Sequence, residues 1–172
     1  MVTAVTVGLA LSEASAWAVL QQVLDPEVPV LSVVELGIVR SVAVHGGRVD
    51  VVVTPTYSGC PATEVINDAI RAALTDAGAA DVRIETRLAP AWTTDWIAPA
   101  ARDKLRAYGI APPHTVADAN AAQPLRFHPR GVACPRCGSK HSEQLSAFGG
   151  TACKALYRCL DCREPFEYFK PI

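Results

Sequence analysis

The chain has 172 residues, half of them hydrophobic, and its 16 Lys and Arg residues nearly balance 17 Asp and Glu residues, giving a formal net charge of -1. This balance disfavours a polyanion-binding surface, so we expect no nucleic-acid partner. No apolar run reaches the ~20 residues that span a bilayer, and the N-terminus lacks the cationic segment of a signal peptide. We therefore expect a cytoplasmic protein with no membrane partner.

The first part of the chain alternates between helix and strand patterns. In chain order, these patterns predict a helix over 12–24, strands over 38–44 and 49–54, a helix over 61–78, a strand over 82–88 and a helix over 93–109. Ser12 suits an N-cap, Pro26 ends the first helix, Pro61 suits a first helical position and Gly78 suits a helix end. The order α-β-β-α-β-α predicts an α+β domain with helices against one face of a small sheet.

The composition changes after this domain. Residues 112–130 are polar, rich in Pro and Ala, and aperiodic, which indicates a linker. We therefore expect an α+β domain over 12–111, a linker over 112–130 and a small terminal module over 131–172.

The terminal module carries two C-x-x-C pairs, Cys134 with Cys137 and Cys159 with Cys162. In a reducing compartment such pairs favour a metal over disulfides, and four thiolates suit the tetrahedral geometry of Zn²⁺. The module has few large apolar side chains, so the metal would supply its folding free energy, on the order of 10 kcal/mol. The pattern predicts a closed, structural Cys₄ zinc ribbon, with iron in a rubredoxin-like site as the alternative.

Two further residues of the module are left over from this ligand set. Cys153 is an alternative ligand, a reactive thiol or, as the favoured interpretation, a small packed residue of the ribbon. His141 is expected to lie on the surface. Acidic residues dilute the basic side chains of the module, which favours protein contact over nucleic-acid binding.

Cys60 lies at the junction of the second strand and the helix that follows. As N-cap it would receive the backbone N–H groups of Ala62 and Thr63, which would lower its pKa, and Gly59 would allow close approach of the backbone. A thiol with a function and a buried capping residue both remain open.

The surroundings of Cys60 limit its chemistry. No histidine is placed as its base, since His45 falls in a turn, so a papain-like nucleophile is disfavoured. A metal or cluster ligand completed by a second subunit or a partner fits better. The Asp25-Pro26-Glu27 turn is, by itself, best interpreted as a helix stop with solvated acids.

These segments also resemble a known family. The stretches 25–27, 35–39 and 56–61 (Asp-Pro-Glu, Glu-Leu-Gly-Ile-Val and Thr-Tyr-Ser-Gly-Cys-Pro) resemble the signature of the MIP18-like family, DUF59, whose members act in iron–sulfur cluster assembly or delivery. The stretches 90–97, 109–113, 153–159 and 164–166 narrow the resemblance to the D subunits of the phenylacetyl-CoA epoxidase system. The resemblance covers nearly everything from Trp17 onward.

The resemblance implies an accessory role in aerobic phenylacetate catabolism, without catalysis by the chain itself. The partners implied are the epoxidase reductase, with its 2Fe–2S cluster and flavin, and the di-iron oxygenase subunits. The chain would assemble or deliver a transient iron–sulfur cluster or iron through Cys60, in one version shared across a homodimer. The residues implied to support Cys60 are Asp25, Glu27, Glu35, Ser58 and Gly59.

Some points stay open within this resemblance. Glu35 stands where the wider family commonly has Asp, which leaves the role of this carboxylate open. Two other functions also stay open, a non-catalytic structural subunit of the oxygenase complex and a thiol-dependent enzyme acting on CoA thioesters.

Overall fold

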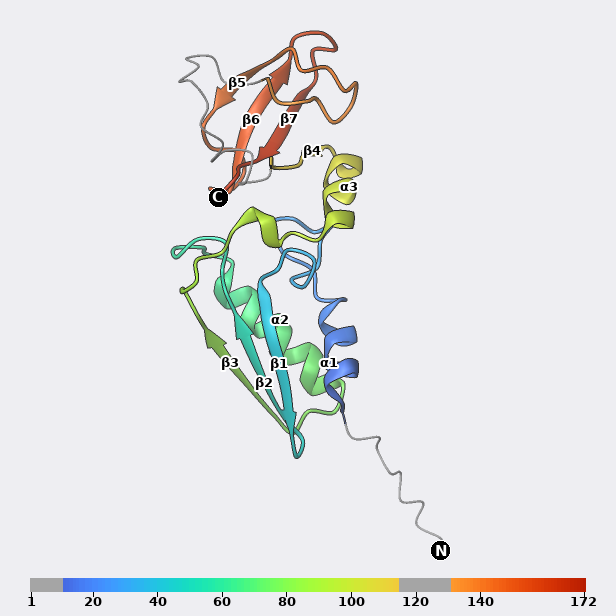
Figure 1. The fold of residues 1–172 in the computed structure, drawn as a ribbon, viewed down its shortest axis with the longest axis vertical. Coiled ribbons are helices and arrows are strands. Elements are labelled where there is room, and N and C mark those ends of the chain that lie inside the picture. The colour runs from blue at the N-terminus through green and yellow to red at the C-terminus, as the bar shows by residue number, and fades with distance from the viewer. Residues whose placement is uncertain (1–10, 115–130) are drawn as a thin grey trace, which may run out of the picture.

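A computed structural model describes residues 11–114 and 131–172, which form an α+β domain and a C-terminal ribbon (Figure 1). Its elements are α1 Glu13–Leu20, β1 Val39–His45, β2 Arg48–Val53, α2 Thr63–Asp76, β3 Asp81–Thr86, the 3₁₀ turn η1 Thr94–Trp96, α3 Pro99–Tyr108, β4 Ile110–Ala111, β5 Ser142–Ser146, β6 Lys154–Cys159 and β7 Pro165–Phe169. None of the helices described is long and apolar enough to cross a membrane.

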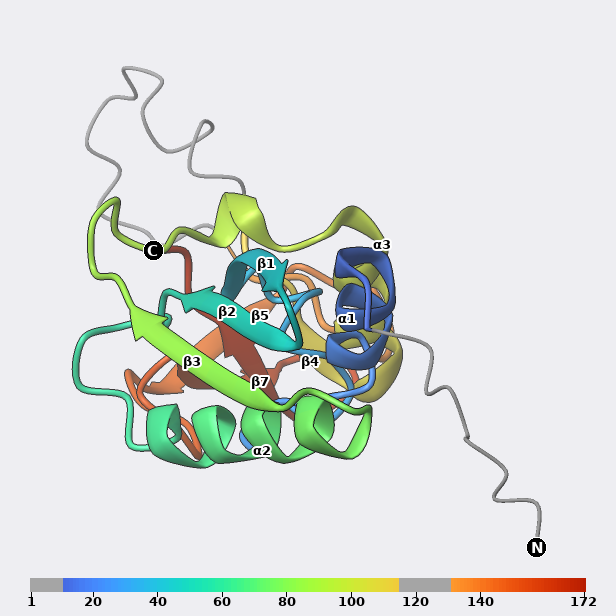
Figure 2. The same ribbon diagram turned by 90° about the horizontal axis from the view of Figure 1, so that it is seen from below.

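The sheet of the α+β domain has the order β1-β2-β3. β1 and β2 form an antiparallel hairpin, and β3 returns parallel to β2 after the crossover helix α2. Figure 2 shows α2 running along one face of this sheet. The buried residues of α2 are Ile66, Ile70 and Leu74, and those of β2 are Val49, Val51 and Val53. The predicted α+β fold is confirmed.

The first helix is shorter than predicted, ending at Leu20. The chain then folds back on itself: Leu24 forms an isolated bridge with Ser32, and the backbone N–H of Asp25 donates to the carbonyl of Leu31 at 3.0 Å. Extending the helix to residue 24 would break these bonds. Because of this fold-back, Asp25 lies inside the molecule.

The ribbon is a second sheet with the order β4-β7-β6-β5. β4 pairs parallel with β7, although it directly follows α3, and the other pairs are antiparallel. The ring of Tyr157 lies 5.8 Å from that of Phe166 and 5.6 Å from that of Tyr168, in a small core of the ribbon's own.

The ribbon also contributes to the core of the α+β domain. Cys153 and Phe169 belong to that core, and the ring of Phe169 lies 6.1 Å from that of Trp92. The backbone N–H of Thr94 donates to the carbonyl of Ile172 at 3.1 Å, and Figure 1 shows the C-terminus between the two sheets. The two parts therefore pack against each other.

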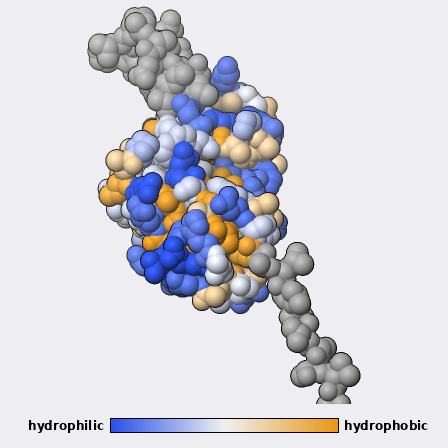
Figure 3. Space-filling view, turned by 60° about the horizontal axis from the view of Figure 1, so that its bottom comes forward, coloured by the Kyte–Doolittle hydropathy of each residue, from blue (hydrophilic) through white to orange (hydrophobic). Residues whose placement is uncertain are grey.

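The face drawn in Figure 3 intermingles hydrophobic and hydrophilic residues, with short hydrophobic stretches interrupted by hydrophilic ones. By contrast, the carboxyl group of Asp25 and the thiol of Cys153 are buried in the interior.

Candidate metal centre and thiol cavity

The four cysteines of the two C-x-x-C pairs converge in the ribbon. Their sulfur atoms all lie within 4.8 Å of one another, with 3.8 Å between Cys134 and Cys162 and 3.6 Å between Cys137 and Cys159. A tetrahedron with metal–sulfur bonds of about 2.3 Å has edges of roughly 3.8 Å. The predicted ligand set therefore fits a tetrahedral metal, and its donor set suits zinc or iron.

Backbone and side-chain contacts hold the two pairs in place. Gly138 and Arg163, the residues that follow each pair, both have positive φ, at 77° and 66°. The backbone N–H of Cys162 donates to the sulfur of Cys159 at 3.5 Å, and this contact, with the N–H of Asp161 and the neighbouring thiols, lowers the pKa of the Cys159 thiol to about 7. The neighbouring thiols instead raise the pKa of Cys162 to about 12, so Cys159 gives up its proton to a metal more readily than Cys162.

His141 connects the two pairs without joining the ligand set. Its Nδ1 lies 3.0 Å from Oδ1 of Asp161, whose other oxygen accepts from the hydroxyl of Ser139. The side chain is 68% exposed, as expected for a surface residue.

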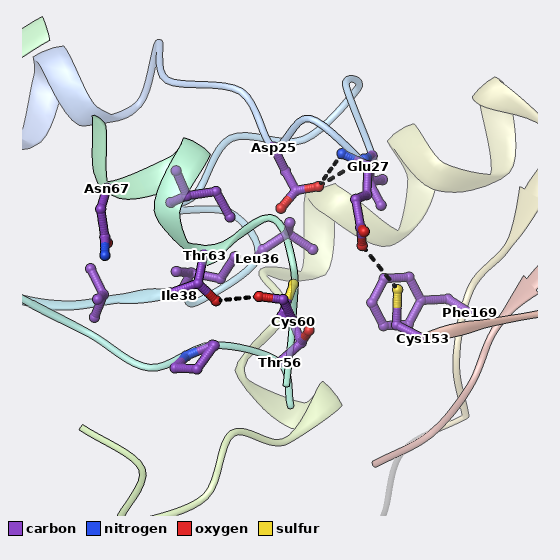
Figure 4. A pocket seen from close by; sticks show the side chains of 14 residues that line it. Asp25, Glu27, Leu36, Ile38, Thr56, Cys60, Thr63, Asn67, Cys153 and Phe169 are labelled. Carbon is purple, nitrogen blue, oxygen red and sulfur yellow. Dashed lines mark hydrogen bonds between the residues drawn. The ribbon is translucent and has the colours of Figure 1, made fainter. Parts of the chain in front are cut away.

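A second group of candidate residues lines a small cavity of about 20 Å³ between the α+β domain and the ribbon. Figure 4 shows Asp25, Glu27, Cys60 and Cys153 around it. A cavity of this size holds about one water molecule or ion. From the sequence, only the family resemblance predicted that the first three of these residues lie close together.

The Asp25-Pro26-Glu27 turn is not a pair of solvated acids. Asp25 is 6% exposed, and its Oδ1 accepts the backbone N–H groups of Glu27 and Val28, each at 2.8 Å. Burial raises the pKa of Asp25 despite these two bonds. Burial and the neighbouring Asp25 also raise the pKa of Glu27. The turn presents two carboxyl groups to the cavity.

The prediction that Cys60 caps the following helix is wrong. α2 begins at Thr63 with Ala62 as its N-cap, so Pro61 lies before the helix. The N–H and hydroxyl groups of Thr63 donate to the carbonyl of Cys60 at 3.2 and 2.9 Å, which closes a turn there instead of a first helical turn.

The expected low pKa of Cys60 is also wrong. Burial raises the pKa of its thiol, the backbone N–H of Ala62 opposes this rise, and the Glu27 carboxylate adds to it. Partial burial, Cys60 and Glu27 likewise raise the pKa of Tyr57 to about 12. At neutral pH the thiol of Cys60 is therefore protonated.

Cys153 occupies a place that sequence reasoning missed. It is packed, as favoured, but in the core of the α+β domain rather than within the ribbon, and it lines the same cavity as Cys60. The two cysteines are far apart in the sequence, and only the docking of the ribbon brings them to one cavity. No local signal in the sequence could have found this pairing.

Three of the predicted supporting residues do not line the cavity. Ser58 and Gly59 are exposed in the loop before Cys60, and a Cβ at Gly59 would meet nothing within 4 Å, so no neighbouring atom of the described chain requires a glycine there. Glu35 accepts from the N–H of Ser32 at 3.0 Å and from Nζ of Lys104 at 2.6 Å.

The turn that holds Glu35 has a packing role. Although partial burial opposes it, the Lys104 ammonium group lowers the pKa of Glu35. Gly37 has a φ of +71°, and a Cβ there would lie 2.8 Å from Cβ of Trp96. The turn thus fixes Glu35 against α3 and brings the segment around Trp96 close to the backbone of Gly37.

Comparison with known proteins finds a family match for each part of the chain. Residues 13–86 match the family model described as "Iron-sulfur cluster assembly protein", and residues 118–170 match the "PaaD zinc beta ribbon domain". The segment 13–86 contains Cys60, and the segment 118–170 contains Cys153 and the four metal-site cysteines.

Over 157 residues the chain is 53% identical to an Escherichia coli (strain K12) protein, the D subunit of a "Putative 1,2-phenylacetyl-CoA epoxidase" by its name, covering 91% of each chain. A crystal structure of a DUF59 domain of unknown function from Bacillus anthracis is similar at 24% identity and a TM-score of 0.51, covering 54% of this chain and 90% of that chain. The second likeness supports the fold of the α+β domain.

Proposed function

Because this chain belongs to the family of 1,2-phenylacetyl-CoA epoxidase D subunits, we propose that it is an accessory protein of that epoxidase. Its role in the proposal is to assemble an iron–sulfur cluster, or to deliver a cluster or iron, to the reductase or oxygenase subunits through Cys60. The match of residues 13–86 to an iron–sulfur cluster assembly protein supports this role. Free thiols and this role both suit a cytoplasmic location.

The observation that carries the proposal is the cavity that joins Cys60 to the buried carboxyl group of Asp25 and the half-buried carboxyl group of Glu27. Asp25 and Glu27 line it together with the Cys60 thiol, and each raises the pKa of that thiol. Groups that disfavour one another's negative charge favour an incoming cation. A thiol that is protonated until its cargo arrives, and is protonated again when the cargo leaves, suits transfer better than storage.

The ribbon has a different role in this proposal. Its four cysteines form a closed ligand set with no open position for a substrate, so we assign it a structural Zn²⁺. When bound, the metal would supply the folding free energy of the ribbon, and Cys134, Cys137, Cys159 and Cys162 would hold it.

A thiol-dependent enzyme receives less support. His45, His114 and His141 are the histidines in the described ranges 11–114 and 131–172, and none of them lines the cavity. Cys60 therefore has no imidazole base among these residues, and its raised pKa makes it a poor nucleophile at neutral pH. The structural-subunit alternative is favoured by the word "subunit" in the name of the E. coli relative.

The test is reconstitution of the 2Fe–2S cluster of the reductase from its apo form, with the native chain or with Cys60→Ser. The native chain is expected to raise the rate of cluster formation, measured by visible absorption, and the variant to give the rate seen without any chain. Ser58→Ala is the matched control, because Ser58 lies in the same loop, exposed and outside the cavity.

Zinc content and thermal unfolding of each variant establish that the fold is intact. Native-like reconstitution with Cys60→Ser would remove Cys60 from the mechanism. Stable stoichiometric co-purification with the oxygenase, unaffected by Cys60→Ser, would then select the structural-subunit function.

A further inference from the structure

The cavity contains a second thiol, contributed by the ribbon. Cys153 lies directly before β6 and is 4% exposed, and its sulfur is 3.0 Å from the hydroxyl of Thr151 and 4.0 Å from Oε2 of Glu27. Figure 4 shows the Glu27 side chain pointing toward Cys153, with Cys60 across the cavity. Two thiols and a carboxyl group from three separate segments of the chain thus line one cavity.

The charges around the cavity favour a cation. The nearest ammonium group, Nζ of Lys154, pairs with Oε2 of Glu167 at 2.6 Å and donates to the backbone carbonyl of Glu27 at 3.3 Å. Within the described part of the chain, neither Asp25 nor Glu27 has an ion-pair partner for its carboxyl group. The Lys154 ammonium group offsets part of the mutual repulsion of these two carboxyl groups, and a divalent cation would offset more of it.

Size and ligand type narrow the occupant. A volume of about 20 Å³ has room for one ion rather than for a cluster of two irons. Thiolate with carboxylate suits borderline ions such as Fe²⁺, Co²⁺ and Zn²⁺, and not Mg²⁺ or Ca²⁺.

Cys60, Cys153 and Glu27 line one cavity, but their ligand atoms do not converge on one point in this structure. Among residues 11–114 and 131–172, the four ribbon cysteines are the only group of potential ligands that lies close enough together to hold a metal. The loop of Cys60 lies between β2 and α2, and Gly59 within it has open space around it. We infer that this loop draws Cys60 toward Cys153, which makes the site labile.

We propose that Cys60, Cys153 and Glu27 are the ligands of a labile site for a single thiol-binding divalent cation such as Fe²⁺, closed jointly by the α+β domain and the ribbon. The inference deepens the proposed function and rests on it for the role of Cys60. On binding, each thiol releases its proton to solvent and forms one sulfur–metal bond, and the oxidation state of the ion does not change. On release, each sulfur–metal bond breaks and the thiol regains a proton.

The test adds Co²⁺ anaerobically, as a spectroscopic probe, to the full chain with its ribbon already filled with zinc. We expect the native chain to bind one Co²⁺ with a thiolate-to-cobalt absorption band while its zinc content stays constant. Cys60→Ser and Cys153→Ser should each lose about half of the band and bind roughly 10- to 100-fold more weakly, the lower limit being the cost of losing an outer-shell contact. Glu27→Gln should weaken binding, whereas the matched control Glu35→Gln should behave as native, because Glu35 lies outside the cavity.

Native-like Co²⁺ binding by Cys153→Ser would overturn the inference. If only Cys60→Ser loses the band, the inference fails but the proposed function stands. No Co²⁺ beyond the zinc site overturns the inference, and the reductase assay decides the proposed function separately.

A second measurement avoids substitution, in case Cys153→Ser does not fold. In the native chain, bound Co²⁺ should slow alkylation of both Cys60 and Cys153, measured by mass spectrometry of peptides. Protection of Cys60 alone would overturn the assignment of Cys153.

Discussion

At the scale of single residues, burial and Glu27 make the Cys60 thiol less acidic, and one backbone N–H makes it more acidic. Burial raises the pKa of the thiol, the N–H of Ala62 opposes the rise and the Glu27 carboxylate adds to it. Because the pKa is raised above the ordinary value of 9.0, the thiolate population is still growing at pH 9. The thiol is therefore unreactive at neutral pH unless a cation replaces its proton.

This balance predicts the pH dependence of alkylation at Cys60. In the metal-free cavity, the rate of reaction with iodoacetamide should rise about tenfold per pH unit up to pH 9 without reaching a plateau. Glu27→Gln removes a negative charge that disfavours the thiolate, so it should lower the pKa and react faster than the native chain at pH 8. Rates from mass spectrometry of the Cys60 peptide decide this, with Glu35→Gln as the control. A plateau below pH 8 in the native chain would contradict it.

At the scale of elements, β7 belongs to two cores. Its last residue, Phe169, is 1% exposed and packs with Trp92 in the core of the α+β domain, whereas Phe148, in the turn between β5 and β6, is 64% exposed. The same side chain on the same small module thus has two different environments.

This contrast predicts the cost of two matched substitutions. Phe169→Ala should lower the free energy of unfolding by about 3–5 kcal/mol, the range for removing a buried Phe side chain. Phe148→Ala should change it by no more than about 0.5 kcal/mol. Urea unfolding followed by tryptophan fluorescence measures both. Equal effects of the two substitutions would show that the ribbon does not stabilise the α+β domain.

The same elements show which features of the structure can be predicted from the sequence. The strand over 49–54, the helix over 61–78 and the grouping of the four ribbon cysteines rest on local patterns, and the structure contains β2, α2 and the four-cysteine group there. The start of α2 was missed because the bonds of Thr63 to the carbonyl of Cys60 close a turn where the position of Pro61 suggests a helix. The position of Cys153 depends on contacts between segments far apart in the chain, and no periodicity or motif encodes such contacts.

At the scale of the whole molecule, strands β6 and β7 belong to the zinc ribbon and also carry or adjoin residues that line the thiol cavity. Cys153 and Lys154 stand at the start of β6, Phe169 ends β7, and all three contact the α+β domain. Strands β6 and β7 also carry or flank the second pair of ribbon cysteines. The metal site therefore fixes the strands that complete the cavity.

Removal of the ribbon metal should consequently weaken the α+β domain, although that domain contains none of the four ligands. The three tryptophans of the chain, Trp17, Trp92 and Trp96, all lie in the α+β domain, so their fluorescence reports on that domain alone. Chelation under reducing conditions should lower the midpoint of their thermal transition by on the order of 10 °C, because ribbon unfolding removes Phe169 from the core. It should also make Cys153 as reactive to alkylation as the four freed ribbon cysteines, and zinc re-addition should reverse both effects. An unchanged tryptophan transition after complete zinc loss would mean that the domain is stable alone, and the ribbon would then be only an appended module.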